Sequence, residues 1–143
     1  MLKEGDKAPD FDLPDQQGDM QSLQSLLNNG PVVVYFYPID FSPVCTAQAC
    51  AFRDNYDDVL QLGKQVVGIS PQTQSSHQRF AQLHALPFPL LSDTSKRTIR
   101  AYGVDGPFGM GVRRATFLVD ESQHVVKRVV SELLVGPHLA LTK

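Results

Sequence analysis

Residues 32–37, Val-Val-Val-Tyr-Phe-Tyr, form an unbroken run of β-branched and aromatic side chains. A strand with one face in water alternates apolar and polar residues, whereas a run without polar positions predicts a strand buried on both faces. Such a strand is typical of the centre of a sheet that helices cover on both sides. The run therefore predicts an α/β fold with these residues at its core.

A helix and a second buried strand are expected next. Residues 46–62 place Phe52, Tyr56 and other apolar side chains among charged ones, a pattern that predicts an amphipathic helix ended by Gly63. Residues 66–70 then form another apolar run. Strand, helix and strand in this order predict a βαβ unit with parallel strands.

Shorter elements are predicted around this unit. They are two short strands and a brief helix within 11–27, a helix over 75–84, a short strand within 86–91, a short helix over 96–102, and an antiparallel hairpin of 115–119 with 124–130. Together they predict a central mixed β-sheet flanked by helices, compatible with a thioredoxin-like arrangement. The length of 143 residues suits one core, and no linker or repeat interrupts it, so we expect a single domain over 1–143.

The composition excludes several classes of protein. Apolar residues make up 42% of the chain and the formal net charge is −2, which predicts a globular protein without a basic surface for nucleic acid. No apolar run reaches the length of a transmembrane helix, and the first residues do not resemble a signal peptide. We therefore expect a cytoplasmic protein with no nucleic-acid or membrane partner.

Cys45 and Cys50, the two cysteines of the chain, follow the first strand. Ser42 suits a helix N-cap and Pro43 suits the first helical position, so Cys45 falls at the third. The backbone N–H groups there lack intrahelical partners and the helix dipole is positive, and both effects favour a nucleophilic thiolate. Pro38 is expected to fix the strand-to-helix turn.

The spacing of the two cysteines leaves two possibilities. Residues five apart in an unbroken helix lie about 8–9 Å apart at Cα, but a disulfide needs less than about 7 Å. Either Cys45 and Cys50 never pair, or the first helical turns unwind and the site is a two-state redox switch. Burial as a small apolar residue is a further alternative, stronger for Cys50, which has Ala49 and Ala51 as neighbours. A metal site is not expected, because four residues separate the cysteines and no histidine is near them in sequence.

Residues 38–45, Pro-Ile-Asp-Phe-Ser-Pro-Val-Cys, resemble the peroxiredoxin active-site pattern of proline, three residues, Thr or Ser, two residues and cysteine. The continuation over 45–54, Cys-Thr-Ala-Gln-Ala-Cys-Ala-Phe-Arg-Asp, is similar to the peroxiredoxin Q branch, also called bacterioferritin-comigratory protein. Weaker similarities follow in order at 5–11, 67–70, 76–77, 86–93, 102–104 and 114–120. The resemblance implies a thioredoxin-like fold and a thiol peroxidase without a cofactor.

The resemblance also implies a role for each site residue. Cys45 would be the peroxidatic cysteine, which attacks hydrogen peroxide or an organic hydroperoxide and becomes a sulfenic acid. Cys50 would be the resolving cysteine, and thioredoxin or a similar thiol reductant would reopen the resulting disulfide. Ser42 and Arg114 would bind the peroxide, Arg114 by paired hydrogen bonds, and Pro38 would shield the sulfur. Members of this branch are monomers or small dimers, so we expect a monomer or a weak homodimer.

Three positions depart from the family pattern. Gln48 stands where Glu is common and is predicted to modify reactivity, because an amide can orient the arginine but adds no charge. Ile39 and Val44 stand where Lys and Gly are frequent, and a more apolar rim would favour organic hydroperoxides. Arg113 competes with Arg114 for the peroxide site. Strand alternation puts the two on opposite faces, and the register of the Thr-Phe pair that follows favours Arg114.

Alternatives remain for the residues and for the function. Ser42 could be only an N-cap, Arg114 could be a surface charge, and Tyr37 is expected in the core. The four histidines are predicted on helix surfaces, in a turn or near the terminus: His77, His84, His124 and His138. The alternative functions are a thioredoxin-like disulfide oxidoreductase, disfavoured because Cys-x-x-Cys is absent, and a non-catalytic thiol protein on the same fold.

Overall fold

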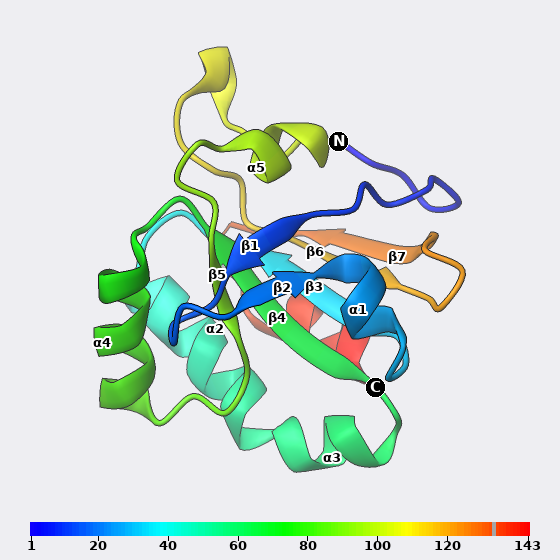
Figure 1. The fold of residues 1–143 in the computed structure, drawn as a ribbon, viewed down its shortest axis with the longest axis horizontal. Coiled ribbons are helices and arrows are strands. Elements are labelled where there is room, and N and C mark those ends of the chain that lie inside the picture. The colour runs from blue at the N-terminus through cyan, green and yellow to red at the C-terminus, as the bar shows by residue number, and fades with distance from the viewer. Residues whose placement is uncertain (133) are drawn as a thin grey trace.

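The computed structural model describes residues 1–132 and 134–143. At its centre lies a five-stranded sheet with the strand order β5-β4-β3-β6-β7 (Figure 1). The strands, in this order, are β5 (Leu90–Ser92), β4 (Gln65–Ser70), β3 (Val32–Phe36), β6 (Ala115–Val119) and β7 (Val125–Val130). Beside this sheet, β1 (Asp12–Pro14) and β2 (Met20–Ser22) form a short antiparallel hairpin.

The central sheet is mixed, as the sequence predicted. β4 is parallel to β3 and β5, whereas β6 is antiparallel to β3 and β7. All residues of β3 are buried, which confirms the prediction of a strand covered on both faces. Its packing leaves no room for a side chain at Gly68 on β4, because a Cβ there would lie 2.7 Å from Cζ of Tyr35. The core therefore fixes the position of the strand from which the cysteine loop departs.

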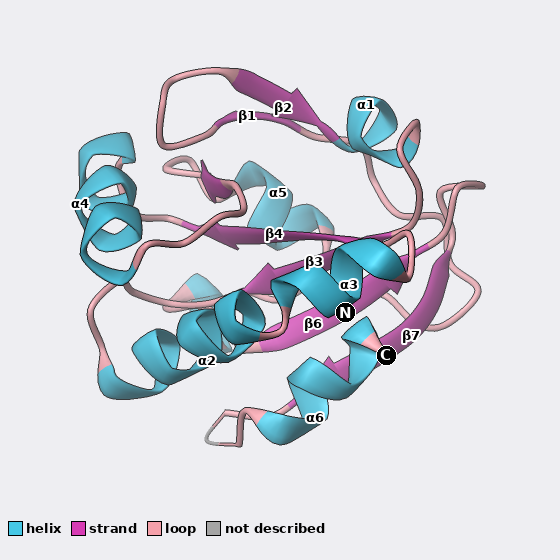
Figure 2. Cartoon of the chain, turned by 90° about the horizontal axis from the view of Figure 1, so that it is seen from below, coloured by secondary structure: helices cyan, strands magenta, loops and turns pink. Residues whose placement is uncertain are grey.

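Helices cover both faces of the sheet. They are α1 (Leu23–Leu27), α2 (Pro43–Asp54), α3 (Tyr56–Gln61), α4 (Gln74–His84), α5 (Arg97–Ala101) and α6 (Gly136–Leu139), with short 3₁₀ turns at Pro107–Gly109 and Ala140–Thr142. Leu23 of α1 and Ile99 of α5 belong to one apolar cluster, whereas Phe52 of α2 and Phe80 of α4 belong to a second. Figure 2 shows α1 on one side of the sheet and α2, α3 and α6 on the other. The cysteine-bearing helix α2 thus packs on one defined face.

The predicted single helix over 46–62 is wrong in one respect, because it is divided into α2 and α3 at Asn55. The backbone of Asn55 has φ −107° and ψ 6°, outside the helical range. Its side-chain Nδ2 donates to the carbonyl oxygen of Ala51 at 2.9 Å. An asparagine side chain that competes for a backbone carbonyl in this way favours a helix end. The helix starts at Pro43 behind the N-cap Ser42, as the sequence predicted.

The predicted βαβ unit and the C-terminal hairpin are both confirmed. β3 and β4 are parallel and the helices α2 and α3 connect them. β6 and β7 pair antiparallel, with a register shift between Leu118 and Val119. Within residues 1–132 and 134–143, no helix combines the length and the apolar character that crossing a bilayer requires.

Candidate active site

The loop between β3 and α2 brings Cys45 to the start of a helix. Ser42 is extended at the N-cap, and its Oγ accepts from the backbone N–H of Cys45 at 3.3 Å. Pro43 occupies the first helical turn, where its missing N–H costs no hydrogen bond. The Cys45 side chain is buried, with 1% of the residue exposed. Ser42 therefore does act as an N-cap, and its hydroxyl proton remains free to donate to a ligand.

Arg114, the residue before β6, reaches Cys45 from the neighbouring strand. Its Nη2 donates to Cys45 Sγ at 3.1 Å and its Nη1 donates to Gln48 Oε1 at 2.8 Å. Its Nε donates to the backbone oxygen of Glu132 at 3.2 Å, and only 4% of Arg114 is exposed. Arg113 instead has a half-exposed side chain, whose Nε lies 3.5 Å from Glu132 Oε1. Of the two arginines, Arg114 is therefore the one beside the sulfur.

The guanidinium of Arg114 has no carboxylate among its hydrogen-bond partners in the described residues, although the Glu132 carboxylate accepts from the backbone N–H of Arg114 at 3.2 Å. Among the described residues, the hydrogen-bond acceptors of its guanidinium are the amide of Gln48, a backbone oxygen and the sulfur of Cys45. Gln48 is fully buried, and its Nε2 has no hydrogen-bond partner there. A buried charge is costly unless an opposite charge compensates it. Ionisation of Cys45 would supply that charge at 3.1 Å.

Behind the cysteine loop lies a buried polar network centred on Asp40. Asp40 Oδ2 lies 2.8 Å from His77 Nδ1 and accepts from Ser76 Oγ at 2.7 Å. Asp40 Oδ1 accepts from Tyr37 Oη at 2.7 Å. Burial alone would raise the pKa of Asp40, but the hydrogen bonds from His77, Ser76 and Tyr37 outweigh it and hold that pKa below its ordinary value. Burial, followed by the nearby negative charges, raises the pKa of the Tyr37 hydroxyl. The network ties the loop to α4.

Two histidines are buried: the predicted helix-surface position of His77 is wrong, whereas His138 does lie near the terminus but inside the core. His77 is fully buried against Asp40, and its Nε2 lies 3.2 Å from the backbone oxygen of Leu91. His138 is also fully buried, between Thr116 Oγ1 at 2.6 Å and the backbone oxygen of Ser131 at 2.8 Å. Burial lowers the pKa of His138. Their partners are 7 to 37 residues away in sequence, so no local pattern marked these histidines as buried.

Cys50 lies in the same helix as Cys45, and both are free thiols. Cys50 is half-buried, and its Sγ is 3.8 Å from Nδ1 of His84, the last residue of α4. Sequence reasoning found no histidine beside the cysteines, because these two residues are 34 positions apart. The intact helix keeps Cys45 and Cys50 unpaired, as its geometry requires.

An apolar rim surrounds the loop. Ile39 is 48% exposed and Phe41 is 46% exposed, and the Phe41 ring packs edge-on against Phe80 with centroids 5.1 Å apart. Phe41 has φ +68°, a left-handed conformation that is costly for a bulky residue. Pro38 lies in the same loop and is half-buried. Exposed apolar side chains therefore lie in the loop that leads to Cys45.

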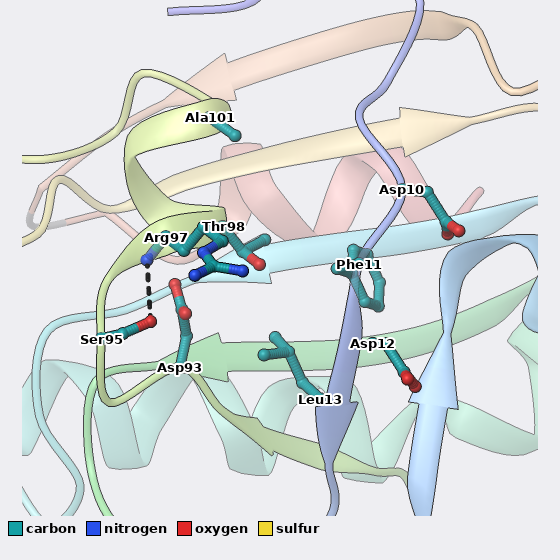
Figure 3. A pocket seen from close by; sticks show the side chains of 9 residues that line it. All are labelled: Asp10, Phe11, Asp12, Leu13, Asp93, Ser95, Arg97, Thr98 and Ala101. Atoms are coloured by element: carbon teal, nitrogen blue, oxygen red, sulfur yellow. Dashed lines mark hydrogen bonds between the residues drawn. The ribbon is translucent and has the colours of Figure 1, made fainter.

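A pocket of about 650 Å³ lies away from the cysteines (Figure 3). Asp10 and Phe11 line it from the chain that enters β1, and Asp93, Arg97 and other residues line it from the segment around α5. Phe11 belongs to the apolar cluster opposite the one that contains Cys45. None of the residues that line this pocket is among the predicted site residues.

A family described as AhpC/TSA matches residues 4–128. The chain belongs to the AhpC/TSA family. Its fold is the thioredoxin-like peroxiredoxin fold, and the resemblance to the peroxiredoxin Q and bacterioferritin-comigratory branch is confirmed.

Similar members of the AhpC/TSA family cover nearly the whole chain. A putative peroxiredoxin bcp of Coxiella burnetii is 41% identical over 145 residues, which are 97% of this chain and 95% of the relative. The crystal structure of the peroxidoxin BcpB of Mycobacterium tuberculosis is 36% identical with a TM-score of 0.92, over 99% of this chain and 97% of the other. A bacterioferritin comigratory protein of Xanthomonas campestris, whose solved structures concern alkyl peroxide reduction activity, is 26% identical with a TM-score of 0.83, over 91% of this chain and 85% of the other.

Proposed function

We propose that this AhpC/TSA family member is a thiol peroxidase in which Cys45 attacks the peroxide. The 3.1 Å contact between Arg114 Nη2 and Cys45 Sγ is the observation that carries this proposal. The thiolate attacks one peroxide oxygen, the O–O bond breaks, and the leaving oxygen takes a proton and departs as water or an alcohol. Cys45 is left as a sulfenic acid.

Two features of the site support a thiolate at Cys45. Arg114 Nη2 contacts the sulfur, and no carboxylate among the described residues bonds to the guanidinium, so an ionised sulfur would pair with it directly. The start of α2 adds the positive end of a helix dipole, whereas the N–H of Cys45 is already bonded to Ser42 Oγ. A thiolate is the nucleophilic form of cysteine. The site is therefore arranged to support the nucleophile that attacks the peroxide.

Ser42 and Arg114 are the proposed donors to the bound peroxide. The Ser42 hydroxyl keeps its own proton, and the Arg114 guanidinium carries five N–H groups in a planar fork. Donors aimed at the oxygens that gain charge in the transition state lower the barrier. Pro38 has no N–H to compete for these oxygens, and we propose that it shields the sulfur.

Cys50 is the proposed resolving cysteine. Its thiol condenses with the Cys45 sulfenic acid, so that an S–S bond forms, the S–O bond breaks and water leaves. Because the intact helix holds the two residues about 8–9 Å apart at Cα, the first turns of α2 must unwind for this step. A thiol reductant of the thioredoxin kind then reduces the disulfide and returns both thiols.

The rim favours organic hydroperoxides as substrates beside hydrogen peroxide. Ile39 and Phe41 expose large apolar surfaces beside the loop, and these can cover the alkyl part of a hydroperoxide. The alkyl peroxide reduction activity of the relative from Xanthomonas campestris supports the same substrate class. A monomer or weak homodimer and a cytoplasmic location stay predictions.

One experiment tests the function. Reduced protein is mixed with one equivalent of hydrogen peroxide, and the intact mass is followed with time. We expect rapid peroxide loss and the loss of two hydrogens from the monomer, mapped to a Cys45–Cys50 bond. Cys45→Ser should abolish turnover, whereas Cys50→Ser should stop at a sulfenic acid on Cys45. An unchanged mass with slow oxidation would instead indicate a non-catalytic thiol protein, and normal recycling of Cys50→Ser by thioredoxin would refute the resolving role.

A further inference from the structure

The half-buried thiol of Cys50 has one side-chain hydrogen-bond partner among the described residues, and that partner is a base. His84 Nδ1 lies 3.8 Å from Cys50 Sγ, within reach of a weak hydrogen bond from the thiol. Nδ1 can accept this proton when the neutral imidazole carries its own proton on Nε2. Peroxide attack by Cys45, as proposed above, does not involve His84.

Two contacts fix the position of His84. The Phe80 ring packs against its imidazole at 5.1 Å between centroids and 70° between planes. Nη1 of Arg53, which lies near the end of α2, donates to the backbone oxygen of His84 at 2.7 Å. This bond joins the last turn of α2 to the end of α4. The contact between Cys50 and His84 is therefore part of a fixed junction between two helices.

We propose that His84 is the acid–base catalyst of disulfide formation, which rests on the proposed role of Cys50 as resolving cysteine. His84 Nδ1 takes the proton from the Cys50 thiol. The resulting thiolate attacks the sulfur of the Cys45 sulfenic acid, the S–S bond forms and the S–O bond breaks. The hydroxide that leaves takes the proton back from His84 and becomes water. A sulfenic acid and a thiol thus give a disulfide and water with no further oxidant, because the peroxide has already oxidised Cys45.

The junction also explains which half of α2 moves. Arg53 and the buried ring of Phe52 hold the second half of the helix, which carries Cys50, against the core and α4. Among the described residues, no hydrogen bond joins the first turn of α2, which carries Cys45, to α4; Cys45 is bonded instead to Ser42 and Arg114. Unwinding of that turn brings the Cys45 sulfenic acid toward Cys50, while Cys50 stays beside His84.

The charges near His84 are compatible with this role. Arg53 contacts its backbone oxygen and Asp54 pairs with Arg53 Nε at 3.0 Å, so the nearest cation is itself partly compensated. A positioned imidazole can remove the proton of a thiol that has not ionised. In alkaline solution hydroxide removes that proton without the imidazole.

The test is the rate of disulfide formation in His84→Gln, which keeps a polar side chain but removes the base. Reduced protein is mixed with one equivalent of hydrogen peroxide and quenched with acid at intervals. The intact mass of each sample is then measured by mass spectrometry. The gain of one oxygen reports attack by Cys45, and the later loss of two hydrogens reports the disulfide. We expect His84→Gln to form the sulfenic acid at the wild-type rate. The disulfide should then form about tenfold more slowly at pH 7, because an unassisted thiol is only a few per cent ionised.

A pH profile separates catalysis from packing. The difference between His84→Gln and wild type should shrink toward none at pH 9.5. His84→Phe, which preserves the packing on Phe80, should behave in the same way as His84→Gln. His124→Gln is the control, because His124 is exposed in the turn before β7 and should leave both rates unchanged.

Equal disulfide rates in His84→Gln and wild type at pH 7 would overturn the role of His84 and leave the proposed peroxidase function standing. An equal slowing at pH 7 and pH 9.5 would also overturn it, since a structural defect does not depend on thiol ionisation. A failure of wild-type Cys45 to gain oxygen would refute the proposed function itself, so the two failures are distinguishable.

Discussion

Arg114 determines the chemistry available to Cys45, because it brings a positive charge into an interior where Gln48 offers only a neutral amide. A glutamate at position 48 would itself compensate the charge of Arg114, and the sulfur of Cys45 would then compete with that carboxylate for the guanidinium. With Gln48, the thiolate is the anion in direct contact with the guanidinium among the described residues. The departure from the family pattern thus strengthens the dependence of Cys45 on Arg114.

Replacement of Arg114 by lysine tests this dependence. An ammonium is a point charge and cannot reach Cys45 Sγ, Gln48 Oε1 and the Glu132 backbone together, as the planar fork does. One hydrogen bond involving a charged group is worth about 1.5–3 kcal/mol, so we expect Arg114→Lys to slow Cys45 oxidation by about tenfold to a hundredfold. Stopped-flow measurement of peroxide consumption gives the rate.

Arg113→Lys is the matched control for that measurement. Arg113 has a half-exposed side chain and pairs with Glu132 at 3.5 Å, a surface contact worth little. Its variant should react at nearly the wild-type rate. A loss of rate in Arg113→Lys with none in Arg114→Lys would reverse the assignment of the two arginines.

Residues whose setting is local were predictable from the sequence, and residues whose setting is tertiary were not. Ser42 and Pro43 indicated a helix start next to Cys45, because N-cap residues and first-turn prolines act over three or four positions. His77 and His138 gave no such signal, since a histidine within a helix looks the same whether a buried carboxylate faces it or water does. Only the fold brings Asp40 to His77.

Among the elements, the loop between β3 and α2 depends on the network centred on Asp40. Asp40→Asn would present an N–H donor where Ser76 or His77 already donates, and would remove the charge that strengthens these bonds. We expect a loss of about 3 kcal/mol in the free energy of unfolding, measured with urea. Asp54→Asn, in an exposed pair with Arg53, should cost less than about 1 kcal/mol. Similar losses in both variants would contradict a special role of the network.

Helix α2 is expected to have two states, folded when Cys45 is reduced and partly unwound when it is bonded to Cys50. Disulfide formation should therefore raise amide hydrogen exchange over residues 43–50, because these N–H groups lose their helical partners. Exchange in β3 should stay unchanged, since its residues are buried in the sheet. Mass spectrometry of peptides from reduced and oxidised protein measures both. Unchanged protection over 43–50 in the disulfide form would rule out the unwinding.

The regular elements were largely predictable because their signals are strong and repeated. β3 is apolar at every position, and a central strand is the one place such a run fits. The division of the helical segment at Asn55 was missed, because the apolar spacing continues across it and a single side-chain bond to Ala51 decides the break. The apolar periodicity identifies the buried face of a helix, but it does not show where a single residue ends the helix.

At the scale of the whole molecule, the C-terminal segment is attached to the sheet through His138. Its Nε2 donates to the backbone oxygen of Ser131, which can only accept, and in the neutral ring its Nδ1 then accepts from the Thr116 hydroxyl of β6. Thr116 is two residues after Arg114, so the segment supports the strand that positions the arginine. The protonation of one buried histidine is thereby linked to the stability of the site.

The free energy of unfolding should fall in two stages as the pH is lowered. Burial lowers the pKa of His138 in the folded protein, so the unfolded chain binds a proton first, and stability is lost as the pH falls below the ordinary histidine value of about 6.5. The pKa of Asp40 is also lowered, so its contribution is present above the ordinary value of about 3.9 and is lost as the pH falls through the folded value. Urea unfolding at intervals between pH 8 and pH 3 measures both stages. His138→Gln should flatten the first stage and leave the second, whereas exposed His124→Gln should preserve both. If the free energy of unfolding of His138→Gln fell between pH 7 and pH 5 as steeply as that of the wild type, other groups would govern stability in that range.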